Sequence, residues 1–174
     1  MRRQPNTVGG GSRTNENGLS FEGRTDLLES FNNHPDFEVK ENKVFQDNRL
    51  VGEYYEKHNF YNHFLEINGV DWKNIISKKY LPDSVFVNLK NNTIYVIEKK
   101  FQQDSGSVDE KLQTCDFKKK IYQKLLDSLD YEVNYYYLLN DWFTKPQYKD
   151  VFDYIESMNW KKFIEFIPFE ELGL

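Results

Sequence analysis

Cysteine is nearly absent from this sequence of 174 residues, with Cys115 as its one thiol. A single cysteine excludes an intramolecular disulfide and a cysteine cage for zinc, so we expect Cys115 to be a small core residue. Long apolar runs are also missing: no stretch approaches about eighteen uninterrupted apolar residues, and residues 1–5 are not followed by the apolar region of a signal peptide. We therefore expect no membrane segment and a cytoplasmic protein.

Positive charge is not in excess either. The chain has 23 Lys and Arg against 28 Asp and Glu, a formal net charge of -5, which gives no electrostatic case for a nucleic-acid coat protein. An enzyme that holds metal carries an acidic site, so the distribution of Lys and Arg matters more than the total. Aromatic residues are abundant at 17%, and together with 39% hydrophobic residues they predict a globular chain with an aromatic-rich core.

The length favours a single domain. Residues 1–17 contain Gly9-Gly10-Gly11 and almost nothing apolar, so we predict a flexible arm there and one domain over residues 18–174. The arm carries Arg13. It is either a disordered tail or an arm that orders on a phosphate backbone or in a minor groove.

Hydrophobic periodicity predicts an alternation of helices and strands. The clearest element is a β-hairpin with strands at residues 84–89 and 93–98, followed by a single long helix over 108–129. The other expected elements are a helix over 19–31, one or two strands within 37–51, two short helices within 54–79, a strand at 133–139, a helix at 148–158 and a strand at 161–166. This order predicts an α/β sandwich.

Three charged residues lie at one end of the hairpin. Glu98 and Lys100 share a face of the second strand because side chains alternate with a period of two, and Asp83 opens the first strand at a position opposite Glu98, about 5 Å away between backbones. Two carboxylates beside a lysine suit phosphodiester cleavage: Asp83 and Glu98 would hold Mg²⁺, and Lys100 would orient a water or stabilise the transition-state charge. The carbonyl of Lys99 would face the same ion.

The arrangement Leu81-Pro82-Asp83 with Glu98-Lys99-Lys100 fifteen residues after Asp83 resembles the PD-(D/E)xK nuclease superfamily. The resemblance covers roughly residues 16–140. It implies a restriction-endonuclease-like core, in which helices flank a central mixed β-sheet, and a DNA-cutting enzyme that uses Mg²⁺, with Mn²⁺ as a substitute. Bacterial or phage origin and an intracellular location are implied as well.

Two further segments resemble parts of such nucleases. Many members carry an acidic residue on the first helix that reaches the metal, and here Glu22 is favoured over Glu16 because it flanks the apolar stripe. The segment Gly106–Thr114 resembles the loop and helix start beside the scissile strand. The DNA contacts expected from these features are Arg13, Ser107, Lys111, Gln113, Thr114 and Lys118, although the run of Lys118–Lys120 is by itself more typical of a solvated helix face.

The most specific hypothesis is a type II restriction endonuclease that cuts double-stranded DNA as a homodimer, since a symmetric pair of sites matches a palindromic target. A repair or resolvase-type nuclease and a phage homing or nicking nuclease share the chemistry, and a DNA-binding module without cleavage shares the fold. Taken singly, Asp83 is also compatible with a turn and Glu98 with a solvated strand end. A histidine nuclease is disfavoured, because the spacing of His58 and His63 does not place both on one helical face.

Overall fold

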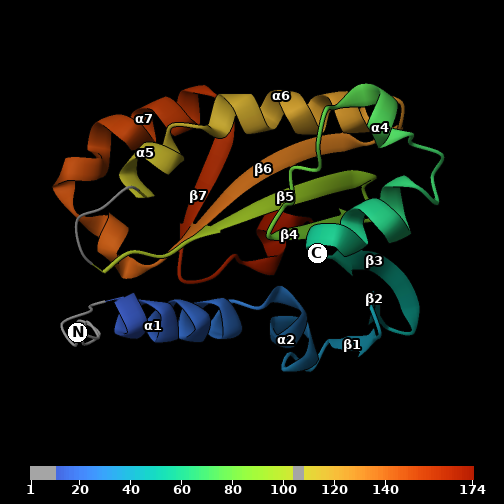
Figure 1. Cartoon of the computed structure of the whole chain (residues 1–174). Coiled ribbons are helices and arrows are strands. Elements are labelled where there is room, and N and C mark those ends of the chain that lie inside the picture. Colours follow the sequence, from blue (N-terminus) through green and yellow to red (C-terminus); the bar gives the residue numbers. More distant parts are fainter. Residues whose placement is uncertain (1–10, 104–107) are drawn as a thin grey trace, which may run out of the picture.

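A seven-stranded mixed β-sheet forms the centre of the molecule (Figure 1). The computed structural model describes residues 11–103 and 108–174 of the chain. The strands follow one another across the sheet in sequence order: β1 (Phe37–Lys40), β2 (Lys43–Gln46), β3 (Arg49–Tyr55), β4 (Ser84–Asn88), β5 (Thr93–Lys100), β6 (Glu132–Leu139) and β7 (Trp160–Ile164). Neighbours from β1 to β5 are antiparallel, whereas β5, β6 and β7 are parallel.

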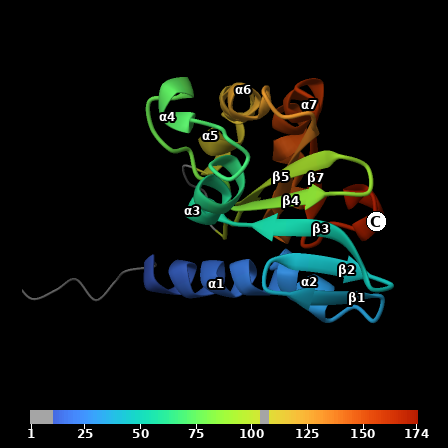
Figure 2. The same cartoon turned by 90° about the vertical axis from the view of Figure 1, so that its right-hand side faces the viewer.

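Helices cover both faces of this sheet. Figure 2 shows α1 (Gly11–Arg24) and α2 (Leu27–Asn32) on one side and α4 (Trp72–Ile75), α5 (Val108–Leu112), α6 (Cys115–Leu126) and α7 (Lys149–Ser157) on the other. The shorter elements are α3 (Lys57–Asn59), the π-helical segment η1 (Phe60–Leu65), and the 3₁₀ turns η2 (Asp141–Thr144), η3 (Pro146–Tyr148) and η4 (Phe169–Leu172). The expected α/β architecture, a mixed sheet flanked by helices, is confirmed.

Strands β4 and β5 lie in the middle of the sheet and form the predicted hairpin. All five residues of β4 and the first six of β5 are buried, as expected for strands covered on both faces. Their register pairs Ser84 with Ile97 and Asn88 with Thr93. The Asn88 side chain accepts hydrogen bonds from the backbone N–H groups of Lys90 (2.7 Å) and Asn91 (3.2 Å), which fixes the turn.

The sheet separates two hydrophobic cores. One lies under α6 and contains Val96, Tyr122 and Leu125, and the other lies against α1 and α2 and contains Phe21 and Phe31. Both are rich in aromatic side chains, as the composition predicted. Cys115 is buried in the first core, as expected.

The predicted helix over residues 19–31 is two helices, separated at Thr25 and Asp26. The Asp26 carboxylate accepts hydrogen bonds from Leu28 N (2.8 Å) and Glu29 N (3.2 Å) and so caps a new helix, α2. Leu19, the first residue of the predicted helix, is exposed, and Phe21 is buried.

Other elements also differ from expectation, and residues 37–55 form three strands where we expected one or two within 37–51. Helix α1 begins at Gly11, so residues 11–17 are helical where we expected a flexible arm, and residues 1–10 lie outside the described residues. A helix continues toward its N-terminus at low cost once its later turns are packed, and polar composition alone does not reveal this. The prediction of one helix over 108–129 is wrong, because the chain breaks at Gln113 and Thr114, where the Thr114 hydroxyl donates to Lys111 O (2.7 Å).

Within the described parts of the chain, no helix has the length and hydrophobicity needed to cross a membrane.

Candidate active site

Asp83, Glu98 and Lys100 meet at one end of the β4–β5 hairpin. The hairpin register, continued by one residue, places Asp83 opposite Glu98. The Lys100 ammonium lies 3.4 Å from Asp83 Oδ2, 3.1 Å from Glu98 Oε2 and 2.8 Å from the Lys99 carbonyl oxygen. Two carboxylates and one carbonyl therefore converge on a single positive charge.

Burial in this group increases from Asp83 through Lys100 to Glu98. The Asp83 side chain is 34% exposed, Lys100 is 15% exposed and Glu98 is 1% exposed. The alternative in which Glu98 is only a solvated strand end is therefore wrong, because α6 covers it. Burial lowers the pKa of Lys100, but the charges of Glu98 and Asp83 and the hydrogen bonds to both outweigh this effect, so the net pKa is raised and the ammonium stays charged.

Helix α6 supplies two further partners of Glu98. The Lys118 ammonium forms an ion pair with Glu98 Oε2, and the Tyr122 hydroxyl donates to Glu98 Oε1 at 3.2 Å. Burial, with the nearby charge of Glu98, raises the pKa of Tyr122 well above its usual range, so the hydroxyl stays protonated as a donor. The two residues are four apart on one helical face, and this spacing is the one sequence signal that links them.

From the sequence we predicted Lys118 as a DNA contact, and we did not predict Tyr122 as a site residue.

Asp83 is held from the strand beside it. The backbone N–H of Lys99 donates to Asp83 Oδ2 at 2.8 Å. The next residue, Ser84, lies 2.9 Å from the Tyr54 hydroxyl through its own hydroxyl oxygen, and Tyr54 in turn donates to the Glu56 carboxylate at 2.5 Å. These contacts fix the segment that presents Asp83 to the group.

Glu22 lies beside this group without joining it. An open cleft of about 260 Å³ contains Glu22 on α1 together with Asp83 and Lys99, and Asp26 and Glu56 also line it. Glu22 is exposed, and among the described residues no three His, Cys, Asp or Glu side chains lie close enough to hold one ion. The structure thus places Glu22 at the same cleft, and its metal role stays a prediction. The Glu16 side chain lies outside the described residues.

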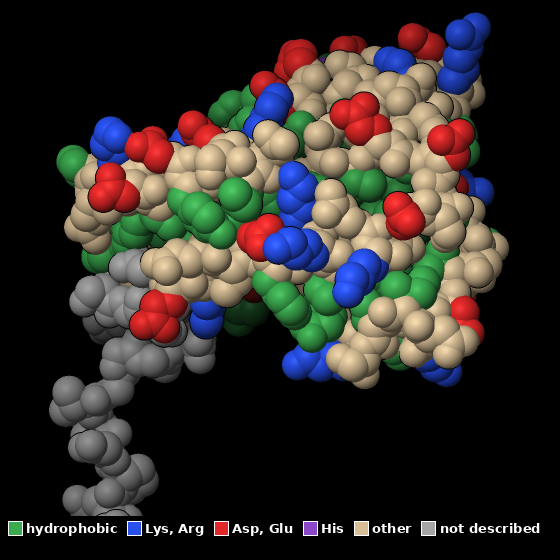
Figure 3. Space-filling model, turned by 90° about the horizontal axis from the view of Figure 1, so that it is seen from above, with side chains coloured by type: hydrophobic (Ala, Val, Ile, Leu, Met, Phe, Trp, Pro, Cys, Tyr) green, Lys and Arg blue, Asp and Glu red, His purple; other side chains and the backbone are tan. Residues whose placement is uncertain are grey.

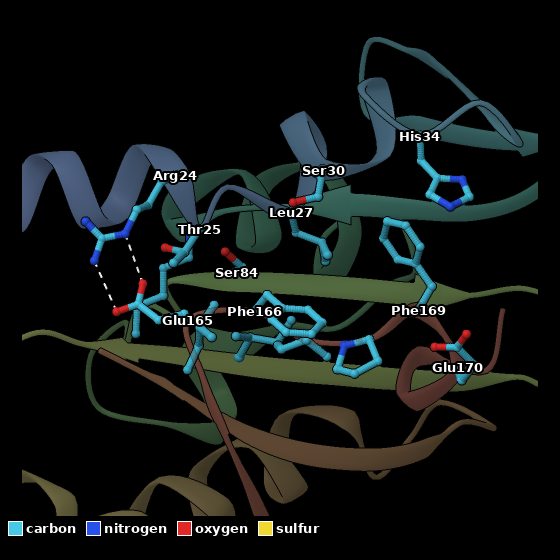
Figure 4. A pocket seen from close by; sticks show the side chains of 15 residues that line it. Arg24, Thr25, Leu27, Ser30, His34, Ser84, Glu165, Phe166, Phe169 and Glu170 are labelled. Carbon is cyan, nitrogen blue, oxygen red and sulfur yellow. Dashed lines mark hydrogen bonds and ion pairs between the residues drawn. The ribbon is translucent and has the colours of Figure 1, made fainter. Parts of the chain in front are cut away.

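Lys99 contributes its backbone N–H and carbonyl to the group and borders a second cavity. A cavity of about 290 Å³ lies between the α1–α2 layer and the segment that follows β7, on the sheet face opposite Glu98 (Figure 4). Its lining is mostly hydrophobic, and the ion pair of Arg24 with Glu165 (2.9 Å) closes one end. Lys99 lines both this cavity and the cleft that contains Asp83 and Glu22, and its carbonyl oxygen is the atom that contacts Lys100.

The structure describes the side chains of three of the remaining predicted DNA contacts. Lys111, Gln113 and Thr114 are exposed at the junction of α5 and α6. Because the chain breaks there, Lys111 and Lys118 do not belong to one continuous helix, whereas Thr114 caps the helix that carries Lys118. The Arg13 side chain and Ser107 lie outside the described residues.

Comparison with known families agrees with this geometry. A family model described as a PD-(D/E)XK nuclease superfamily domain matches residues 33–125, just over half of the chain and the part that holds Asp83, Glu98, Lys100, Lys118 and Tyr122. No curated protein and no solved structure matches the chain. The chain therefore belongs to the PD-(D/E)XK nuclease superfamily.

Proposed function

We propose that this protein is a Mg²⁺-dependent endodeoxyribonuclease, and more specifically a type II restriction endonuclease that cuts double-stranded DNA as a homodimer. Its family indicates a nuclease that acts on DNA. The observation that carries the proposal is the convergence of the Asp83 and Glu98 carboxylates and the Lys99 carbonyl on one positive charge.

The residues fit a hard divalent cation. PD-(D/E)XK nucleases generally use divalent metals, and oxygen donors of this kind suit Mg²⁺, with Mn²⁺ as a substitute. Asp83 and Glu98 would hold the ion together with the carbonyl of Lys99. The partial exposure of Asp83 leaves one side open to water and substrate. When bound, the ion withdraws charge from the scissile phosphate and lowers the pKa of a water molecule.

The lysines of the site balance the carboxylate charges in the free protein and would contact the substrate when it binds. In the free protein Lys100 and Lys118 balance the charges of Glu98 and Asp83, which a buried carboxylate requires. With a divalent cation on these oxygens, Lys100 would lose them as partners, and its ammonium would contact the attacking water or the phosphate oxygens. Lys118 adds a second positive charge on the α6 side.

We propose Glu22 as a further acidic residue that acts on the ion from α1, across the cleft that it shares with Asp83. Lys111, Gln113 and Thr114 are proposed DNA contacts because they are exposed at the start of α6. Arg13 and Ser107 complete the proposed DNA-binding set.

The homodimer rests on the reaction. One site of this kind cuts one strand, and two symmetric sites cut both strands of a palindrome. A repair or resolvase-type nuclease, or a phage homing or nicking enzyme, would use the same residues, and a monomer that only nicks would favour these alternatives. The non-enzymatic alternative is a protein that binds DNA without cutting it.

A supercoiled-plasmid assay tests the proposal. We expect wild-type protein with Mg²⁺ or Mn²⁺ to give linear DNA, and Glu98→Ala to lose cleavage because an ion ligand is gone. The matched control is Glu132→Ala, which removes an exposed carboxylate from the start of β6 and should cut at the wild-type rate. If the wild type binds the plasmid but leaves it uncut with either metal, and Glu98→Ala behaves the same, the protein is a binding module. Light scattering in the same buffer measures the oligomeric state.

A further inference from the structure

Phe117 is an exposed aromatic residue beside the candidate site. It lies in the first turn of α6, its neighbour in sequence is Lys118, and its side chain is 51% exposed. Its ring packs edge-on against that of Tyr80, with 5.3 Å between centroids and an angle of 71°. Single exposed hydrophobic residues are common on protein surfaces, so exposure alone does not indicate a binding role, and the neighbouring residues have to be considered.

The Phe117–Tyr80 pair contacts both segments that build the candidate site, the one before Asp83 and helix α6. Tyr80 precedes Asp83 by three residues. Its carbonyl accepts a hydrogen bond from the Tyr61 hydroxyl (2.9 Å) and lies 3.4 Å from the Tyr122 hydroxyl. The same Tyr122 hydroxyl contacts Glu98. The aromatic pair is thus fixed between the segment that carries Asp83 and the helix that covers Glu98.

Two lysines, Lys78 and Lys118, lie next to the members of the pair. The Lys78 ammonium lies 5.2 Å from the centre of the Tyr80 ring, and Lys118 extends from α6 to the site. Figure 3, which looks down on the α6 and α7 side of the sheet, shows Lys and Arg side chains among hydrophobic side chains in the middle of this face. Lysines bind phosphates, whereas an exposed ring fixed in place binds the flat face of a base.

We propose that the Phe117–Tyr80 pair is a stacking platform for an unpaired nucleobase next to the scissile phosphate. This inference rests on the proposed nuclease function and narrows its substrate to DNA that has, or acquires on binding, an unstacked base at the cleavage site. A nucleic acid is favoured over an apolar partner protein because the platform adjoins a phosphate-binding site and is bordered by Lys78 and Lys118.

Binding of labelled oligonucleotides with Ca²⁺ in place of Mg²⁺ tests the inference without relying on cleavage. The ligands are a paired duplex, the same duplex with a central unpaired flap, and the single strand. Phe117→Ala should weaken binding of the flap and the single strand roughly tenfold, with a smaller effect on the paired duplex, because stacking of one base is lost. Phe117→Trp should restore binding, and its fluorescence should be quenched by the flap DNA.

Phe166→Ala is the matched control. It removes another exposed phenylalanine, 67% exposed, from the segment after β7, and should bind all three ligands like the wild type. Thermal unfolding of Phe117→Ala verifies that the variant is folded.

Equal binding of all ligands by Phe117→Ala and wild type, or a loss that Phe117→Trp does not restore, would overturn the stacking role. In that case cleavage of plasmid by the wild type would leave the proposed nuclease function standing. A wild type that binds none of the ligands and cuts no plasmid would overturn both.

Discussion

At the scale of single residues, the charge of Glu98 organises the candidate site. A buried carboxylate without partners is costly, and three groups stabilise this one: the ammonium groups of Lys100 and Lys118 and the hydroxyl of Tyr122. The lysines keep some exposure to solvent, so they can change partners when substrate and ion bind. Tyr122 is buried and has no such freedom, which makes it a positioning residue.

Tyr122→Phe should lower metal-dependent cleavage by about 10- to 100-fold, because the Glu98 oxygen that receives its hydroxyl loses a donor that orients it. The loss should shrink as the Mg²⁺ concentration is raised, since a weakened ion site fills at higher concentration. A rate measured across a Mg²⁺ titration checks this. Tyr135→Phe is the control: it removes a buried hydroxyl that contacts Lys119 O at 3.3 Å, away from Glu98. Equal rates for both variants at every Mg²⁺ concentration would refute the positioning role.

At the scale of elements, the hairpin that carries the site depends on close packing against β3. Gly52 on β3 pairs with Asn88 on β4, and a Cβ atom built at Gly52 would lie 2.3 Å from Phe86 Cζ and 2.9 Å from Val87 O. The glycine therefore permits β3 to approach β4, and the buried Phe86 ring fills the space beside it.

Gly52→Ala should destabilise the protein by about 1–3 kcal/mol, because the added methyl group collides with a buried ring and a backbone carbonyl. Gly23→Ala provides the contrast. A Cβ atom at Gly23, near the end of α1, meets nothing within 4 Å, so this variant should stabilise the protein by about 0.5–1 kcal/mol through helix propensity. Urea unfolding of both variants measures the difference, and a stable Gly52→Ala would show that the two strands separate easily.

At the scale of the whole molecule, the sheet divides two cores in which tyrosines are prominent. Burial raises the pKa of Tyr61 to about 12, and it raises the pKa of Tyr135 and Tyr137 further. The folded state therefore holds these phenols protonated at pH values where the unfolded chain ionises them.

Stability should fall as the pH rises above about 10. Because the folded pKa exceeds the unfolded one, the contribution of each buried phenol is complete below pH 10 and is lost as the pH rises toward the folded value, about 12 for Tyr61. Urea unfolding between pH 8 and pH 12, within the range set by these pKa values, measures the decline. Tyrosinate absorbance gives the second readout: all 12 tyrosines titrating normally in the native protein would contradict the explanation.

The features that could be predicted from the sequence are those that depend on residues close together in the chain. The β4–β5 hairpin and the meeting of Asp83, Glu98 and Lys100 follow from strand alternation and one turn, which are local properties of the sequence. The breaks between α1 and α2 and between α5 and α6 were missed, because the side-chain hydrogen bonds of Asp26 and Thr114 compete with helix continuation.

The sequence by itself determined the α/β class, the hairpin and the three charged residues at its end. Only the tertiary structure decided that Glu98 is buried, that Lys118 and Tyr122 reach it from 20 and 24 residues away, and that Phe117 lies on Tyr80. The physical reason is that periodicity shows which face of an element is buried, whereas the partners on that face depend on how α6 packs across the sheet.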